Sequence, residues 1–79
     1  MKFEDIVFPV YRRYRNGRSY FKIINERSFE EVGSLGTKRI VSVTEAKQFP
    51  EMIFIRDLLV NYKGMAEEIS AEEYERFKS

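Results

Sequence analysis

The residues in this sequence with the most evident chemistry form a short basic and aromatic run, YRRYRNGRSYFKI, at residues 11–23. The run holds four arginines, one lysine and three tyrosines, and it contains no acidic residue. Arginine guanidinium groups bind phosphates and carboxylates in a forked geometry, and tyrosine rings stack on nucleic-acid bases. This combination predicts a surface that binds anions, and single-stranded nucleic acid is one ligand class that fits it.

Two other interpretations of the same run need no ligand. The arginine stems can lie over the tyrosine rings as a solvated surface. Alternatively, the acidic C-terminal segment can neutralise the charge within the molecule, since residues 64–79 carry five acidic and two basic residues whereas residues 1–24 carry six basic and two acidic ones. The net charge is only +1, which is low for a nucleic-acid-binding domain. We therefore favour these interpretations, with an acidic protein partner and nucleic acid as the other candidates.

Catalytic chemistry has little support in the composition. The sequence contains no cysteine and no histidine, which excludes thiol and imidazole nucleophile pairs, zinc sites with nitrogen or sulfur ligands, and disulfide bonds. Glu45 and Asp57 could act as an acid–base pair in one cleft, but nothing in their spacing places them together. The loop GSLGT at residues 33–37 lacks the lysine of a phosphate-binding loop and is expected to be a turn. The sequence predicts a protein that is not an enzyme and needs no cofactor.

The glutamates near the C-terminus raise the question of a calcium site. Calcium takes roughly six to eight oxygen ligands, which proteins present from a loop. In the stretch AEEISAEEYE the glutamates fall on different faces of a helix, and no D-x-D-x-D-G loop is present. We interpret them as the solvated end of a helix, and we predict no metal site.

A β-hairpin is the first element needed to position the basic run. Asn16-Gly17 lies between two β-prone runs, and this dipeptide in a type I′ turn is the strongest local signal for a hairpin. A two-residue loop there sets the register of the two strands. The expected opposed pairs are Arg15–Arg18, Tyr14–Ser19, Arg13–Tyr20, Arg12–Phe21 and Tyr11–Lys22.

Side chains alternate between the two sides of a strand, so this register sorts the hairpin residues onto two faces. The better core face, with Arg12 as its one charged member, would carry Val10, Arg12, Tyr14, Ser19, Phe21 and Ile23. The opposite face is both basic and aromatic, and we call it the basic hairpin face. It would carry Tyr11, Arg13, Arg15, Arg18, Tyr20, Lys22 and Ile24.

The middle of the chain predicts one short helix and one more strand. Ser28 and Glu31 have the spacing of a capping box, and Gly33 suits a left-handed stop, which together predict one or two helical turns at residues 29–32. The β-branched run KRIVSVTEAK predicts a third strand at residues 38–47, with its two valines on one face and its isoleucine on the other.

The stretch FPEMIFIRDLLVNYKG is compatible with a helix or with a buried strand. Apolar residues recur at helical spacing, Pro50 suits the first helical turn, and Gly64 suits the stop. The segment MIFI alone would also suit a buried strand. We favour a helix at residues 51–62 because the two leucines continue the helical period beyond MIFI.

The last segment has the most complete local helix signals. Ser70 is an N-cap residue, Glu73 can close a capping box, and Ile69 can pack on Tyr74 as a hydrophobic staple. These signals predict a helix at residues 71–78. A helix this short is unstable alone in water, so its aromatic residues must dock on the sheet.

The chain resembles a family of small bacterial single-domain proteins that have no assigned function. The likeness lies in the basic and aromatic hairpin at Tyr11–Ile23, in FEEVG and in AKQFPEMIFIRD, and it spans about residues 11–74. It implies no reaction, ligand or binding site. The first ten residues and the charges of the hairpin lie outside it.

Aromatic residues make up 15% of the sequence, which is high for so small a domain. Some are expected to stay exposed, and an exposed aromatic patch usually marks an association surface. Homodimerisation through a sheet edge or a hydrophobic face is therefore a further hypothesis. The phenylalanines expected to lie mostly in the core are Phe3, Phe8, Phe21, Phe29, Phe49, Phe54 and Phe77.

Together these features predict a single α+β domain over residues 1–79, in which a small antiparallel sheet led by the Asn-Gly hairpin packs against two short helices. Both helices are expected to cover the apolar face of the sheet. The N-terminus lacks the pattern of a signal peptide, and the longest apolar run is far below the ~20 residues of a membrane span. The sequence therefore predicts a soluble cytoplasmic protein.

The predicted function is that of a non-catalytic interaction protein. Its partner would be another protein or a second copy of the chain. Weak, salt-dependent binding of single-stranded nucleic acid is the alternative. The contact surface in both cases is the basic hairpin face, for which we select Tyr11, Arg13, Arg15, Arg18, Tyr20 and Lys22.

Overall fold

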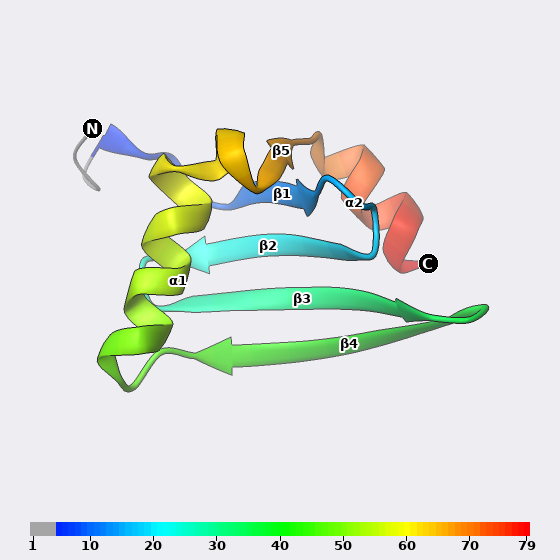
Figure 1. Ribbon diagram of the computed structural model, residues 1–79, viewed down its shortest axis with the longest axis horizontal. Coiled ribbons are helices and arrows are strands. Elements are labelled where there is room, and N and C mark those ends of the chain that lie inside the picture. Colours follow the sequence, from blue (N-terminus) through cyan, green and yellow to red (C-terminus); the bar gives the residue numbers. More distant parts are fainter. Residues whose placement is uncertain (1–4) are drawn as a thin grey trace.

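The part of the chain described by the computed structural model, residues 5–79, forms a five-stranded antiparallel sheet with strand order β4-β3-β2-β1-β5 (Figure 1). Two helices and one 3-10 turn complete it, and the α+β class with an Asn-Gly hairpin and two short helices is confirmed. Phe3, one of the expected core residues, lies outside the described residues. The elements are β1 (Val10–Tyr14), β2 (Ser19–Asn25), β3 (Ser28–Leu35), β4 (Lys38–Glu45), α1 (Phe49–Val60), η2 (Tyr62–Gly64), β5 (Ala66–Glu68) and α2 (Ala71–Lys78).

The register of the first hairpin is as the sequence predicts, with Arg13 opposite Tyr20 and Arg12 opposite Phe21. The turn itself differs from the predicted type I′. Gly17 has a positive φ of 74° but Asn16 does not, and the Gly17 N–H donates to the Tyr14 carbonyl at 2.8 Å. The strands end at Tyr14 and resume at Ser19, so the loop has four residues and Arg15 and Arg18 lie in it rather than in the ladder.

The prediction of a short helix at residues 29–32 is wrong, because this segment belongs to β3. It pairs on one side with β2 and on the other with β4. Phe29 and Val32 are both buried but on opposite sides of the sheet, and Glu31 accepts a hydrogen bond from the Ser19 hydroxyl at 3.2 Å. Two hydrogen-bonded neighbours stabilise a central strand more than a capping box stabilises one isolated helical turn.

The glycine that turns the chain after β3 is Gly36, with a φ of 65°, and Gly33 lies inside the strand. The strand predicted at residues 38–47 is confirmed as β4, which ends two residues earlier, at Glu45. β5, a three-residue strand that pairs with β1, is not predicted by the sequence. A strand of three residues is too short to show a periodic pattern.

Both predicted main helices form. α1 begins two residues before the expected start, with Gln48 as its N-cap, a capping box to Glu51 and Pro50 in its first turn. α2 covers the predicted residues, and the Ser70 hydroxyl accepts a hydrogen bond from the Glu73 N–H at 3.1 Å. Within residues 5–79, neither helix has the length and apolar character needed to span a membrane.

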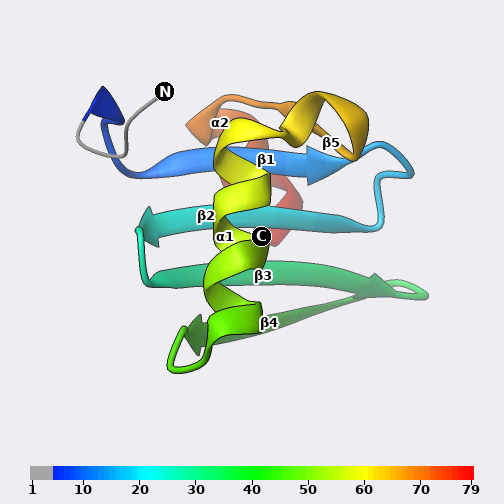
Figure 2. The same ribbon diagram turned by 60° about the vertical axis from the view of Figure 1, so that its left-hand side comes forward.

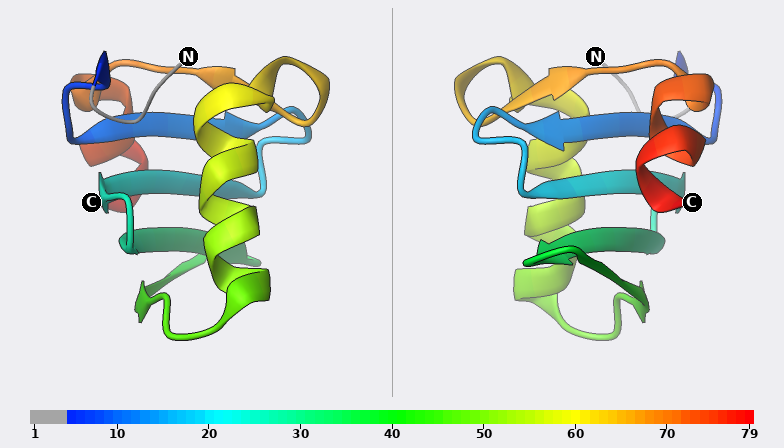
Figure 3. Two further views of the ribbon diagram at one scale, coloured as in Figure 1. Left: turned by 90° about the vertical axis from the view of Figure 1, so that its left-hand side faces the viewer. Right: turned by 90° about the vertical axis from the view of Figure 1, so that its right-hand side faces the viewer.

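The expectation that both helices cover one face of the sheet is wrong: α1 lies on one face and α2 on the other (Figures 2 and 3). Phe21 and Ile23 are fully buried under α1, and we call that side the α1 face. Tyr20 and Val32 are buried under α2 on the opposite side, the α2 face. The central strands carry apolar residues on both faces, so each face needs its own cover.

The aromatic residues in the described part of the chain are divided between these two cores, with one exception. Phe54 on α1 packs edge-on against Phe21, with ring centroids 5.7 Å apart, and Phe29 completes the group. Phe49, at the first position of α1, is 73% exposed and does not belong to the core.

Candidate functional site

The basic hairpin face is largely covered by α2, so its aromatic residues pack within the molecule. Tyr20 is only 8% exposed, and its ring stacks on that of Phe77 at a centroid distance of 3.7 Å. The Tyr11 ring lies 5.3 Å from that of Tyr74. The two rings proposed to stack on bases are therefore already in contact with α2.

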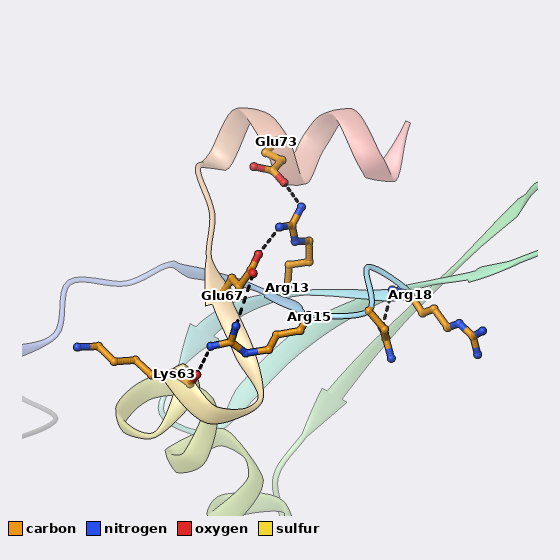
Figure 4. A network of polar contacts seen from close by, with 7 residues as sticks. Arg13, Arg15, Arg18, Lys63, Glu67 and Glu73 are labelled. Carbon is orange, nitrogen blue, oxygen red and sulfur yellow. Dashed lines mark hydrogen bonds and ion pairs between the residues drawn. The ribbon is translucent and has the colours of Figure 1, made fainter.

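Arg13 is neutralised by the acidic C-terminal segment (Figure 4). Its guanidinium group pairs with Glu67 of β5 and, at 3.0 Å, with Glu73 of α2. The hydrogen bond with Glu67 is the main reason that the pKa of Arg13 is raised and that of Glu67 is lowered. Internal charge compensation, one of the interpretations from the sequence, is confirmed for Arg13. Since all three side chains are about one-third exposed, solvent screens both pairs and each stabilises the fold only weakly.

Of the other three residues selected on the basic hairpin face, Arg15 and Arg18 lie in the hairpin loop and Lys22 lies within β2. Arg15 is exposed, bonds the backbone carbonyl of Lys63 and comes within 4.0 Å of Glu67. Arg18 is exposed and extends away from this network (Figure 4), and it has no ion pair within residues 5–79. Lys22 is half-buried and lies opposite Glu30 in the sheet. The six selected residues thus do not form one open surface.

A second polar cluster on the α2 face was not expected from the sequence. The Tyr74 side chain is fully buried, and its hydroxyl donates to the Glu30 carboxylate at 2.7 Å. The Lys78 ammonium group lies 3.0 Å from the same oxygen. The sequence signal for this cluster is the alternation of residues 28–35 as a strand, in place of the helical turn that the capping-box spacing predicts. In a strand, Glu30 shares the α2 face with Val32.

The Tyr74 cluster predicts that the fold is sensitive to high pH. Burial, followed by the hydrogen bond to Glu30, raises the pKa of Tyr74 above its ordinary value near 10. The stability from this raised pKa is complete below pH 10 and is lost as the pH rises, because the unfolded chain releases the proton first. We expect the free energy of unfolding to fall by up to about 1.4 kcal/mol per pH unit above 10. Urea unfolding at several alkaline pH values measures this, and Tyr74→Phe should show a smaller slope. Equal slopes in the two proteins would contradict the assignment.

The most exposed apolar segment of the sheet is its outer strand, β4. All of its residues except Thr44 are exposed, and Val43 is 64% exposed. The exposed apolar side chains lie on both faces, since Val41 pairs with Val32 of the α2 face and Ile40 pairs with Gly33 on the α1 face. No charge and no proline interrupt the five residues from Ile40 to Thr44.

Within residues 5–79, the backbone of β4 also has unpaired groups. The Ala46 N–H donates to the Arg27 carbonyl at 2.6 Å, so by alternation Thr44, Ser42 and Ile40 bond β3. The N–H and C=O groups on the other side of β4 point away from the sheet, and we call this side the free edge. It is formed by Arg39, Val41, Val43 and Glu45.

Natural sheets usually protect such edges, and here only one of the two is protected. The opposite edge is β5, which is three residues long and contains two glutamates. β4 is eight residues long, and its pairing with β3 runs without a bulge from Lys38 to Glu45. Long, regular edges whose central residues carry no charge are templates for pairing with another strand.

The possible acid–base pair is not assembled. Glu45 lies at the end of β4, whereas Asp57 lies on α1 and accepts a hydrogen bond from the Asn61 side chain at 3.3 Å. Within residues 5–79, no hydrogen bond joins Glu45 to Asp57.

Comparisons of the chain with protein-family models, with curated protein sequences and with solved structures found no significant match. The resemblance to small bacterial proteins stays an interpretation of the sequence.

Proposed function

We propose that this protein is a non-catalytic interaction module that binds an extended polypeptide segment as an additional strand along the free edge of β4. The observation that carries this proposal is the eight-residue outer strand, which combines exposed apolar side chains with outward-pointing backbone groups. Strand addition of this kind takes affinity from main-chain hydrogen bonds and specificity from side-chain contacts on alternate positions.

A hollow lies next to β4 on the side of the β2–β3 turn, and not on the free edge. It has a volume of about 690 Å³, and its lining includes Val43 and Glu45 of β4 together with Phe8 and Ile24. The rest of its lining is polar (Asn25, Glu26, Arg27 and Ser28), so acidic and basic groups both lie in it and it favours no single kind of partner side chain.

Binding through the basic hairpin face, to an acidic protein or to single-stranded nucleic acid, is second to this proposal. Tyr11 and Tyr20 would have to leave their contacts with α2 before they could stack on bases. Of the selected arginines, Arg18 alone has neither an ion pair nor a side-chain hydrogen bond within residues 5–79. Few phosphates could be neutralised by so few cations.

We also propose that the protein is not an enzyme, for two reasons. The sequence has no histidine or cysteine, and Glu45 and Asp57 belong to different elements, with no hydrogen bond between them within residues 5–79. A cytoplasmic location is part of the proposal because it suits a chain without cysteine.

Peptide selection with a matched pair of variants tests strand addition. In Val43→Pro, the edge loses an N–H that points away from β3, so the inner ladder is kept. Val43→Thr keeps that N–H and a β-branched side chain. Random ten-residue peptides are selected on the wild-type protein, and the affinity of the synthetic winners is measured by calorimetry. We expect Val43→Pro to weaken binding by about tenfold or more, and Val43→Thr to weaken it much less. If no selected peptide distinguishes the wild-type protein from Val43→Pro, the proposal is wrong.

An oligonucleotide titration tests the second candidate. A single-stranded oligothymidine is titrated into the wild-type protein at low and at moderate salt. The titration is then repeated with the double variant Arg15→Ala, Arg18→Ala. We expect no binding that depends on these arginines. Salt-sensitive binding that disappears in the double variant would show that the basic hairpin face is the contact surface.

A further inference from the structure

We propose that the segment bound along the free edge is β4 of a second copy of this chain, with Ser42 of one subunit opposite Ser42 of the other. This inference rests on the proposed function, because it names the partner for the same edge. The two five-stranded sheets would then form one continuous antiparallel sheet across a two-fold axis.

Symmetry limits the possible registers. A two-fold axis perpendicular to the sheet keeps every side chain on its own face, and opposed residues in a ladder share a face. A residue on the axis must therefore face itself. Residues of the free edge must also lie opposite residues of the partner's free edge, because only these have backbone groups that point outward. Three registers meet this condition with most of β4 paired, and they are centred on Val41, Ser42 or Val43.

Charge distinguishes these three registers. Centring on Ser42 places Arg39 opposite the partner's Glu45, twice by symmetry. Centring on Val43 places Arg39 opposite the partner's Lys47, which is a repulsive pair. Centring on Val41 places Glu45 opposite the partner's Thr37, beyond the end of that strand. The register centred on Ser42 is the one in which the charges of β4 complement themselves.

The same register covers the exposed apolar side chains. On the α2 face, Val41 lies opposite the partner's Val43, so four valines meet between the two Arg39–Glu45 pairs. On the α1 face, Ile40 lies opposite the partner's Thr44. These side chains are among the most exposed apolar groups of the isolated chain, with Ile40 at 53% and Val41 at 45%. β-branched cross-strand pairs of this kind stabilise antiparallel ladders.

Arg39 is held in place for this contact at the end of α2. Its guanidinium group lies 4.2 Å from the ring centroid of Phe77, and its Nε donates to the Phe77 carbonyl at 2.9 Å. The two terminal nitrogens of the guanidinium group are left to donate to the partner's Glu45. In the other edge strand, by contrast, self-pairing of β5 would bring Glu67 and Glu68 of two subunits together.

Sedimentation and the two Val43 variants test whether the dimer forms through β4. We expect the wild-type protein to change from monomer to dimer across a roughly hundredfold concentration range. Val43→Pro should lower the association constant about tenfold or more, whereas Val43→Thr should change it little. Circular dichroism confirms that each variant is folded. A wild-type protein that stays monomeric, or a dimer that Val43→Pro leaves unchanged, would refute the inference.

Cysteine cross-linking tests the register. The natural sequence has no cysteine, so every disulfide must form at the introduced position. Ser42→Cys places two thiols opposite each other in a non-hydrogen-bonded pair, where Cα atoms are about 4.5 Å apart and a disulfide can form. Ile40→Cys is the matched control, because it lies on the same strand and face but would oppose Thr44 of the partner subunit. Under mild oxidation we expect Ser42→Cys to give covalent dimers at least about tenfold faster than Ile40→Cys. Equal rates would overturn the register.

The results separate this inference from the proposed function. A monomeric protein whose selected peptides still bind in a Val43-dependent manner would refute self-pairing and leave strand addition intact. A monomeric protein with no such peptides would refute both.

Discussion

Tyr74→Ala is expected to lower the free energy of unfolding by about 3–5 kcal/mol, which is comparable to the whole net stability of a domain this small. Tyr74 is the largest fully buried side chain, and it packs on the α2 face with Tyr20 and Val32. Its removal leaves α2, an eight-residue helix, without its main contact with the sheet. Far-UV circular dichroism and urea unfolding at neutral pH measure the loss.

Tyr74→Phe is the control for this experiment, because it keeps the ring and removes only the hydroxyl. The Glu30 carboxylate then keeps its pair with Lys78, so we expect a loss of about 1–2 kcal/mol. If Tyr74→Ala unfolds at nearly the same urea concentration as the wild-type protein, the core under α2 contributes little and our account of this face is incorrect.

Arg12→Ala is expected to cost about 2–4 kcal/mol, although arginine is an unusual residue for a core face. Arg12 is 8% exposed, and its Nε donates to the Leu58 carbonyl in the last turn of α1 at 3.0 Å. Its guanidinium carbon lies 3.9 Å from the ring centroid of Tyr62. The last turn of α1 contains no basic residue of its own. Arg12 therefore supplies, from β1, the cation and the donor that this helix end lacks.

Two further variants separate these roles of Arg12. Arg12→Lys keeps the charge but has a shorter reach and no planar fork, and we expect an intermediate loss. Arg12→Met fills a similar volume without charge or donor. Burial lowers the pKa of Arg12, so the charge has a desolvation cost that Met avoids. Urea midpoints at neutral pH rank the three variants, and an Arg12→Met protein as stable as the wild type would show that the contact with α1 is not stabilising.

Local patterns were sufficient for the elements that carry their own signals. Asn16-Gly17 between two β-prone runs determined the register of the first hairpin, even though the turn has four residues in place of two. The cap at Ser70 and the helical period after Pro50 determined α2 and α1. These signals act between residues close in sequence, so the local structure that they favour does not depend on where distant segments pack.

The candidate site depended on contacts between distant residues. The sequence identified the basic hairpin face and its acidic counterpart, but α2 had first to lie across the hairpin before Arg13 could meet Glu73. The sequence also placed Val41 and Val43 on one side of a strand. It did not indicate that this strand would be at the edge of the sheet, because edge position is decided by the order of all five strands.

The sequence by itself thus determined the lack of thiol and imidazole groups, the register of the first hairpin and the two main helices of this protein. The tertiary structure decided which face each helix covers, that residues 28–35 form a central strand, and that β4 is exposed. The physical reason is burial: a side chain such as Phe29 or Val32 is stabilised in a strand only when another element covers it, and that element lies far away in the sequence.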